Sequence, residues 1–424
     1  MASTPVASFR ADPTVRAGPA PGPTESPSGP LLLFGFECSL DTAAIDTLEG
    51  VARSVTRARV AAGFARHTST EEIALLATCH RVEIVGLART PEEVERWRDL
   101  LPGPTAAWRF REGREVIRHL FRVAAGRESL AVGEAEAGEQ VRVAGRSILS
   151  RHPRPVLREV FCRATEELPR TSEPDARSIA SFATEHLRRL LPEGTPRVLV
   201  VGSGTVGRQV TRRLAPHARV TVVYHERAPA DSFLRATGSD AVPLDRLRES
   251  AETADAIVTA AKFGNHGLRP SDLPSGRSIV LVDLGMPRNI DPAVRALPSV
   301  RLVDLQELYE LSRSSSDRGE IDPRLEELAD RCSDRLERLL WEPWVSAWYR
   351  AAENLRRSEL ENARGFLGPL TPDQEVALDR LTRRLVSRLL LPPTERFRSF
   401  PPGPAGERQR RLAQELLRFS ASDP

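Results

Sequence analysis

Apolar residues recur with two different periods along the first third of the chain. Short apolar runs predict strands at residues 31–37, 72–78 and 81–87. Three- and four-residue spacing predicts helices over residues 45–64, 91–101 and 113–126. This alternation predicts a mixed α/β domain over residues 31–165. Residues 1–30 are rich in Pro, Gly, Ser and Thr, and without apolar residues for a core they are predicted to be a disordered tail.

The middle of the chain alternates buried-type strands with helices. A strand over residues 197–201 is followed by Gly202, Gly204 and Gly207, then by a helix and a second strand over 219–224. Later apolar runs continue the pattern and predict a doubly wound parallel sheet, the Rossmann type, over residues 166–310. Glycines spaced GxGxxG between a strand and a helix permit a tight turn and close approach to a pyrophosphate. The alternative is a glycine-rich turn that binds no cofactor.

The end of the second strand bears on the choice of dinucleotide. It ends at Tyr224, where NAD-binding chains usually carry the acid that binds the ribose 2′-hydroxyl. Glu226 comes two residues late, whereas His225 and Arg227 suit a 2′-phosphate. These residues favour NADPH over NADH.

The last third of the chain has a helical pattern over residues 311–400. Leucines and one cysteine form a stripe on one helix face, namely Leu325, Leu328, Cys332, Leu336 and Leu339. Such a stripe needs a partner, either in the same chain or across a dimer, and it makes Cys332 a core residue. Residues 381–390 repeat the pattern, and Pro392 and Pro393 are predicted to end that helix. Residues 401–424 form a C-terminal extension.

Composition excludes several classes of function. The chain has 424 residues, of which 61 are basic and 58 acidic, so its net charge of +3 indicates no general polycation for nucleic acid. Its apolar runs are too short to cross a bilayer, and no signal peptide opens it. The four cysteines show no zinc-ligand spacing, so no metal site is predicted, and the reduced cytoplasm is the expected compartment.

One cysteine lies where a reactive group would be presented. Cys79 falls between two predicted strands and is followed by His80 and Arg81. A thiol reacts as thiolate, which nearby positive charge favours. On this stretch alone, the residue is either a nucleophile or a small side chain packed at a strand end.

Several motifs in one order resemble the glutamyl-tRNA reductase family. Residues 77–83, ATCHRVE, are similar to the family's STCNRxE around its nucleophile, and residues 119–141, HLFRVAAGRESLAVGEAEAGEQV, are similar to its HLFRVASGLDSxxLGExQIxGQV. Residues 281–294 resemble its DxAxPRxIDP stretch, and residues 381–398 resemble the end of its dimerisation region. The resemblance covers about residues 31–400.

The resemblance implies an architecture and a reaction. It implies a catalytic domain, an NADPH-binding Rossmann domain and a long helix leading to an all-α dimerisation domain, in a V-shaped homodimer. The thiolate of Cys79 would attack the ester of glutamyl-tRNA(Glu), release tRNA and leave a thioester. Reduction with NADPH would give glutamate-1-semialdehyde, the first step of tetrapyrrole (porphyrin, heme) synthesis. Whether a glutamate-1-semialdehyde aminotransferase docks to receive the aldehyde is open.

The resemblance also assigns roles to individual residues. Cys79 and His119 match the catalytic positions, the histidine acting on the ester or as an acid; its alternative is a helix-face histidine that caps a carbonyl. Arg81 matches a position that binds the substrate, where its fork suits a carboxylate. The substrate-binding positions are Thr78, His80, Arg81, Ser129, Glu134, Ala135, Glu136 and Gln140. The cofactor-binding positions are Gly202, Ser203, Gly204, Thr205, Val206, Gly207 and Arg227.

The chain departs from the family pattern at several points. His80 replaces an asparagine, Glu136 a glutamine and Glu128 an aspartate, and the stretch over 35–49 lacks the family's histidine. The basic stretch that follows the catalytic domain is replaced by residues 167–178. Two further interpretations therefore stand beside the working reductase. One is a paralogue that has lost turnover and binds or regulates heme synthesis, and the other keeps the thioester chemistry with a different acyl donor.

Overall fold

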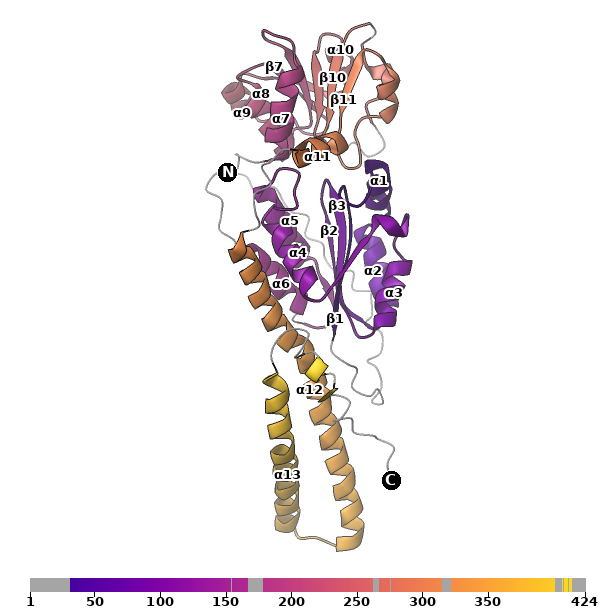
Figure 1. Cartoon of the computed structure of the whole chain (residues 1–424), viewed down its shortest axis with the longest axis vertical. Coiled ribbons are helices and arrows are strands. Elements are labelled where there is room, and N and C mark those ends of the chain that lie inside the picture. Colours follow the sequence, from indigo (N-terminus) through magenta and orange to yellow (C-terminus); the bar gives the residue numbers. More distant parts are fainter. Residues whose placement is uncertain are drawn as a thin grey trace.

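The computed structural model describes residues 31–153, 155–166, 178–261, 267–274, 276–314, 322–400, 406, 408–410 and 412–413. The predicted tail of residues 1–30 and residues 167–177 lie outside the described residues, as does most of the C-terminal extension. The described chain forms an elongated molecule, with two α/β parts stacked end to end and a long helical hairpin extending from them (Figure 1).

The first part is a five-stranded antiparallel sheet with helices on both faces (Figure 1). Its strand order is β4-β1-β3-β2-β5. The strands are β1 (Leu32–Ser39), β2 (Thr70–Ala77), β3 (Arg81–Ala88), β4 (Arg109–Glu112) and β5 (Leu149–Ser150). The helices are α1 (Ile45–Ser54), α2 (Arg57–Arg66), α3 (Pro91–Asp99), α4 (Arg114–Ala124), α5 (Ala135–Arg146) and α6 (Val156–Glu166).

Alternation along β1 explains how one sheet serves two cores. Phe34 and Phe36 belong to the hydrophobic cluster under α1–α3, whereas Leu33 packs in the cluster under α4–α6. Because side chains of a strand point alternately to its two faces, a strand covered on both sides must be apolar at nearly every position. Glu37 and Glu83 break this rule, with only 3% and 2% of their surface exposed. Both point to the α4 face.

The second part confirms the predicted doubly wound sheet. Six parallel strands lie in the order β11-β10-β9-β6-β7-β8. The strands are β6 (Arg197–Val201), β7 (Arg219–Tyr224), β8 (Asp240–Pro243), β9 (Ala256–Thr259), β10 (Ile279–Asp283) and β11 (Val300–Val303). The helices are α7 (Ile179–Leu190), α8 (Thr205–Leu214), α9 (Asp231–Thr237), α10 (Leu247–Ala251) and α11 (Leu305–Ser314).

The two α/β parts contact each other through polar pairs that are buried or partly buried. After β10, the Arg288 backbone N–H and guanidinium both donate to Glu49 of α1, at 2.7–2.9 Å. From α11, Tyr309 donates to Asp41 at 2.6 Å and Ser312 to the Leu130 carbonyl at 2.6 Å. These contacts hold the segment after β10 and helix α11 against the first domain.

The helical third part is a hairpin of α12 (Pro323–Leu367) and α13 (Pro372–Arg398). The predicted stripe finds its partner within the chain, because Leu325, Cys332 and Leu336 are buried in the cluster under α4–α6. Along the same contact, Arg114, Arg118 and Arg122 of α4 pair with Asp334, Asp330 and Glu326 of α12. Four-residue spacing on both antiparallel helices produces this ladder of ion pairs.

Two boundaries differ from the sequence prediction. The helix predicted over residues 45–64 is two helices, because the chain turns at Val55 and the Thr56 side chain caps α2 by accepting from the Arg59 backbone. The prediction that Pro392 and Pro393 end the last helix is wrong, since α13 continues to Arg398. Beyond the prolines, Phe397 packs between Trp341 and Trp344, and this burial compensates for the backbone hydrogen bonds that the prolines lack.

Candidate active site

Cys79 and His80 form the centre of the tight turn between β2 and β3. The Thr78 backbone N–H donates to the Arg81 carbonyl at 2.9 Å, which closes the turn. The Thr78 hydroxyl accepts from the His80 backbone at 3.4 Å. The turn therefore presents a half-buried Cys79 at the end of two inner strands of the sheet, while His80 and Arg81 are buried.

A continuous chain of side-chain contacts joins the thiol to His119. The Cys79 Sγ lies 3.4 Å from Nδ1 of His80, and Arg81 Nε donates to Nε2 of the same ring at 3.3 Å. Arg81 Nη1 donates to Glu83 Oε1 at 2.8 Å, and that oxygen lies 2.9 Å from Nε2 of His119. The two residues matched to catalytic positions are therefore connected through Arg81 and Glu83.

Charges in this chain are compensated internally. Burial opposes ionisation of Glu83, but His119 and Arg81 hold the pKa of its carboxyl at about 2. Burial and the charge of Glu83 both act to raise the pKa of Glu37. The opposing effects of His119, Arg81 and Arg111 are larger together, so the pKa of Glu37 is also lowered. Glu37, Glu83 and His119 are close enough to share a cation. Arg81 and Arg111, each paired with one of the two carboxylates, already provide positive charge there.

The expected activation of Cys79 by its neighbours is not found in this arrangement. Burial and the charge of Arg81 lower the pKa of His80 to about 3, so the ring is neutral. Burial, followed by the charges of Glu134 and Glu136, raises the pKa of the Cys79 thiol to about 12, and Arg81 opposes this only weakly. The sequence places two cationic residue types beside the sulfur, but one is neutral and the charge of the other is compensated by carboxylates.

Arg81 has partners other than the one suggested by the resemblance. In addition to His80 and Glu83, it donates through Nη2 to the Glu128 carbonyl. Only 3% of its surface is exposed. These partners occupy three of the five N–H donors of the guanidinium, and the part of Arg81 in substrate binding stays a prediction.

A glycine-rich loop between α4 and α5 carries the other matched residues. Gly126 has φ of +67°, and a Cβ there would lie 2.5 Å from the Glu134 backbone nitrogen, so the loop folds closely over the start of α5. Ser129 and Glu134 are buried in it. The helix α5 begins at Ala135, and its half-buried residues include Glu136 and Gln140.

Glu134 is a buried carboxyl with a single backbone donor from the second domain. Its Oε1 accepts from the Ile179 N–H at 3.3 Å. Burial raises the pKa of this carboxyl to about 7, the hydrogen bond opposes the shift and Glu136 adds to it. Near neutral pH this carboxyl therefore retains its proton more than an exposed glutamate does.

The glycine turn after β6 has the shape that a dinucleotide requires. A Cβ on Gly207 would lie 1.9 Å from the Gly202 carbonyl oxygen, so the helix and turn approach as closely as only glycine allows. Gly204 is exposed with open space around it, and α8 begins at Thr205 with free backbone donors for an anion. Val206 is half-buried, and the Ser203 hydroxyl donates to the carbonyl of the exposed Arg227 at 3.0 Å. These residues fit a pyrophosphate.

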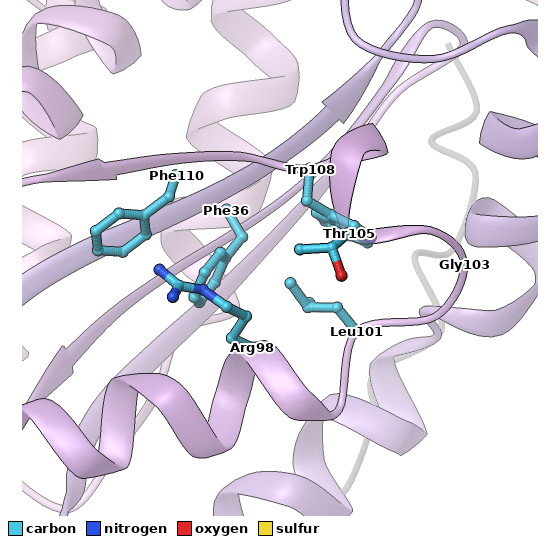
Figure 2. A pocket seen from close by; sticks show the side chains of 7 residues that line it. All are labelled: Phe36, Arg98, Leu101, Gly103, Thr105, Trp108 and Phe110. Carbon is cyan, nitrogen blue, oxygen red and sulfur yellow. The ribbon is translucent and has the colours of Figure 1, made fainter.

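A hollow lies on the other face of the first sheet (Figure 2). The guanidinium of Arg98 lies over the Phe110 ring, 4.9 Å from its centroid. The lining residues are Phe36, Arg98, Leu101, Gly103, Thr105, Trp108 and Phe110. Phe36 and Glu37 are neighbours on β1 and point to opposite faces, so the sheet separates this hollow from the network around Arg81.

Sequence reasoning missed Glu37 and Glu83. Glu83 closes the ATCHRVE motif and could have been recognised as an acid at an inward position of an otherwise apolar strand. Glu37 offered the same signal in LLFGFECS. Burial of both acids requires cationic partners, and those partners come from elsewhere in the sequence.

The fold and site define a class of protein: a thiol-bearing antiparallel α/β domain joined to a dinucleotide-type parallel sheet and a helical hairpin. Family models match each part. Residues 37–167 match the glutamyl-tRNAGlu reductase N-terminal domain, residues 187–311 shikimate / quinate 5-dehydrogenase, and residues 324–419 the glutamyl-tRNAGlu reductase dimerisation domain. The chain belongs to the glutamyl-tRNA reductase family.

Two relatives with known sequences agree with this assignment. The chain is 27% identical to glutamyl-tRNA reductase 2 of Koribacter versatilis over 358 residues, which cover 78% of this chain and 81% of the relative. It is 28% identical to the glutamyl-tRNA reductase of Solibacter usitatus over 412 residues, which cover 89% of this chain and 96% of the relative. Among solved structures, the glutamyl-tRNA reductase from Methanopyrus kandleri is 26% identical to this chain. The match covers 91% of this chain and 98% of that structure, with a TM-score of 0.48.

Proposed function

We propose that the protein reduces glutamyl-tRNA(Glu) to glutamate-1-semialdehyde with NADPH and releases tRNA, the entry reaction of tetrapyrrole synthesis. The observation that carries the proposal is the contact chain from Cys79 through His80, Arg81 and Glu83 to His119. It joins the half-buried thiol of the turn between β2 and β3 to an imidazole in a domain that packs against a dinucleotide-type sheet. The cytoplasm, where charged tRNA is found, is the proposed compartment.

The thiol of Cys79 performs the acyl transfer. Its sulfur bonds to the carbonyl carbon of the glutamyl ester, the bond to the ribose oxygen breaks, and the thiol proton ends on the released hydroxyl of tRNA. Covalent capture divides one difficult reduction into two steps. We assign to His119, whose Nε2 lies 2.9 Å from Glu83 Oε1, the role of assisting as a proton donor.

When bound, NADPH would supply a hydride for the thioester carbon; the aldehyde forms as the carbon–sulfur bond breaks and the Cys79 thiol is regenerated. The backbone of residues 202–207 and the start of α8 would hold its pyrophosphate. Arg227 is exposed beyond β7 beside Ser203, where its charge suits a 2′-phosphate. A shikimate dehydrogenase type of dinucleotide domain is consistent with this cofactor.

The helical hairpin supports a homodimer. Apolar side chains on α13 are exposed at four-residue intervals, namely Leu381, Leu385 and Leu389, at 56%, 52% and 72% of their surface. A leucine stripe of this kind is typical of a helix that packs against another helix. None of the described helices combines the length and apolarity that a bilayer span requires.

The direct test is an assay of the purified protein with glutamyl-tRNA and NADPH. The wild type is expected to form semialdehyde, and Cys79→Ser is expected to form none while keeping its fold. Cys162→Ser, at another half-buried thiol on α6, is the matched control and should retain activity. Wild-type protein that forms no semialdehyde would favour a binding or regulatory paralogue, and semialdehyde from Cys79→Ser would refute the nucleophile.

A further inference from the structure

Helix α2 carries exposed arginines and no acid. Arg57, Arg59 and Arg66 are exposed, and the sequence of this helix, RARVAAGFAR, contains no aspartate or glutamate. Their guanidiniums donate to backbone carbonyls, and no ion pair joins them to a carboxylate of the described residues. The three arginines of α4, in contrast, all pair with acids of α12. The charge on α2 is therefore uncompensated, and such a surface attracts a polyanion.

Small side chains form the outermost strip of the same helix. Ala58, Ala62 and Ala65 are exposed. Arg57 lies on one side of this strip and the other two arginines lie on the opposite side, because positions 59 and 66 are almost two full turns apart. A phosphate backbone could approach the alanines closely while guanidiniums reach it from both sides.

Helix α2 packs directly against α3 and the segment that follows it. A Cβ on Gly63 would lie 2.9 Å from the Trp97 ring and 3.7 Å from Leu100. The next residue, Leu101, lines the hollow on this face of the first sheet (Figure 2). The arginines of α2 and the hollow therefore belong to one continuous face of the domain.

Aromatic rings and a guanidinium line this hollow together (Figure 2). The Phe110 ring is 38% exposed, and the indole of the half-buried Trp108 is held by its bond to the Pro102 carbonyl at 2.9 Å. The Arg98 guanidinium lies 4.9 Å from the Phe110 centroid, and its charge is shared with Glu95. An accessible ring beside a guanidinium is the combination on which an unpaired nucleobase stacks.

We propose that the face formed by α2, α3 and β4 binds RNA, with phosphates on the arginines of α2 and one unpaired base against Phe110. The inference rests on the proposed function, because tRNA is the substrate there and must be held while its ester reaches Cys79. Strand β2 links α2 to the turn of Cys79, and its eight residues span roughly 26 Å. RNA on this face is therefore held by the same domain that presents the thiol.

The hollow distinguishes RNA from the other polyanion that exposed arginines attract, an anionic membrane. A planar base fills a recess lined by rings, whereas a layer of lipid headgroups contacts charges alone. The two contributions also separate experimentally. Phosphate contacts set the salt dependence of binding, and a stacked base adds affinity that depends little on salt.

Binding of uncharged tRNA(Glu) to the full-length protein tests the proposal without NADPH or any reaction. Fluorescence anisotropy gives Kd at several KCl concentrations between about 50 and 200 mM. The combined variant Arg57→Gln, Arg59→Gln and Arg66→Gln should lower the slope of log Kd against log salt by about 2–3, since each phosphate contact contributes about 0.7–0.9. Lysine at the same three positions keeps the charges and should retain the wild-type slope.

Phe110→Leu separates the base from the phosphates. It keeps an apolar side chain but removes the ring, so Kd should rise about fivefold with an unchanged salt slope. The charge-matched control combines Arg188→Gln, Arg235→Gln and Arg248→Gln, three exposed arginines of the dinucleotide domain. It removes the same net charge from another surface and should change the slope by less than about one.

An unchanged slope in the α2 glutamine variant, or an equal fall in the control, would overturn the proposal. An unchanged Kd in Phe110→Leu would overturn the placement of the base. The α2 variant is also mixed with phosphatidylglycerol vesicles. Loss of vesicle binding with tRNA binding intact would overturn the proposal in favour of a membrane surface.

These outcomes are separable from that of the proposed function. A lowered slope in the α2 variant of a protein that forms no semialdehyde would keep the RNA-binding face without the reduction. Semialdehyde formation by the wild type, with the same tRNA affinity and slope in every variant, would remove this face alone.

Discussion

The turn that carries Cys79 and the glycine turn of residues 202–207 are built in opposite ways, although both belong to the proposed active site. Around Cys79 the side chains are buried and bonded to one another, and the sulfur is held as a thiol. Around Gly204 the backbone is exposed, with open space where a side chain would lie. The turn at Cys79 is surrounded by a network of compensated side-chain charges, whereas the glycine turn is preformed by its backbone geometry. The first depends on side chains that are distant in sequence, whereas the second depends on one short stretch of backbone.

The largest effect is expected from breaking the charge network. Glu83→Gln removes the carboxylate that pairs with Arg81 and His119 in a buried place, and loss of one partner of a buried pair costs about 3–5 kcal/mol. Denaturant unfolding at pH 7 measures this loss. Glu112→Gln, an exposed acid of β4, is the control, and equal stability of the two variants would show that the network is not compensated as described.

The glycine turn provides the next test, with a matched pair inside one motif. In Gly207→Ala the new Cβ would meet the Gly202 carbonyl at 1.9 Å, so the turn must open, at a cost of about 2–3 kcal/mol and with loss of NADPH binding. Gly204→Ala has space for its methyl group and should keep its stability while binding NADPH more weakly, because the methyl group occupies the approach of the pyrophosphate. Thermal unfolding and cofactor fluorescence distinguish the two. Similar unfolding curves would contradict the packing at Gly207.

The raised pKa of Glu134 predicts a stability difference that depends on pH. A carboxyl whose pKa rises from 4.5 unfolded to about 7 folded binds more protons in the folded state, so its contribution to stability falls as pH rises between these values. Glu134→Gln lacks this dependence and should exceed the wild type by about 3 kcal/mol at pH 8, with little difference at pH 4.5. Urea unfolding at both values is the measurement. A difference in unfolding free energy that does not change with pH would contradict the raised pKa of Glu134.

The smallest effect concerns the choice of dinucleotide. Arg227 is exposed, so Arg227→Ala should weaken NADPH binding by about tenfold, and NADH binding and folding should stay unchanged. Isothermal titration with both cofactors checks it. Arg219→Ala, at the opposite end of β7 and paired with Asp240, is the matched control. Equal losses for NADPH and NADH in Arg227→Ala would place Arg227 away from a 2′-phosphate.

The contrast between the turns also explains what the sequence could predict. The glycine turn depends on residues within one stretch, so spacing and flanking strand and helix patterns suffice to place it. The strands on either side of Cys79 could likewise be predicted from local residue patterns. The pKa of the Cys79 thiol could not be predicted in this way. It depends on Glu134 and Glu136, and the adjoining network includes Glu37; all three acids are distant from Cys79 in sequence. The passage of α13 through two prolines depends on aromatic packing from α12, which is equally non-local.

The most direct test of the central claim is to trap the acyl group on Cys79. The protein is mixed with labelled glutamyl-tRNA without NADPH, quenched in acid and digested, and the peptide that contains Cys79 is analysed by mass spectrometry. We predict one glutamyl group on that peptide, labile to hydroxylamine, and none in Cys79→Ser. A label on another residue, or on the wild-type protein and Cys79→Ser alike, would contradict the account.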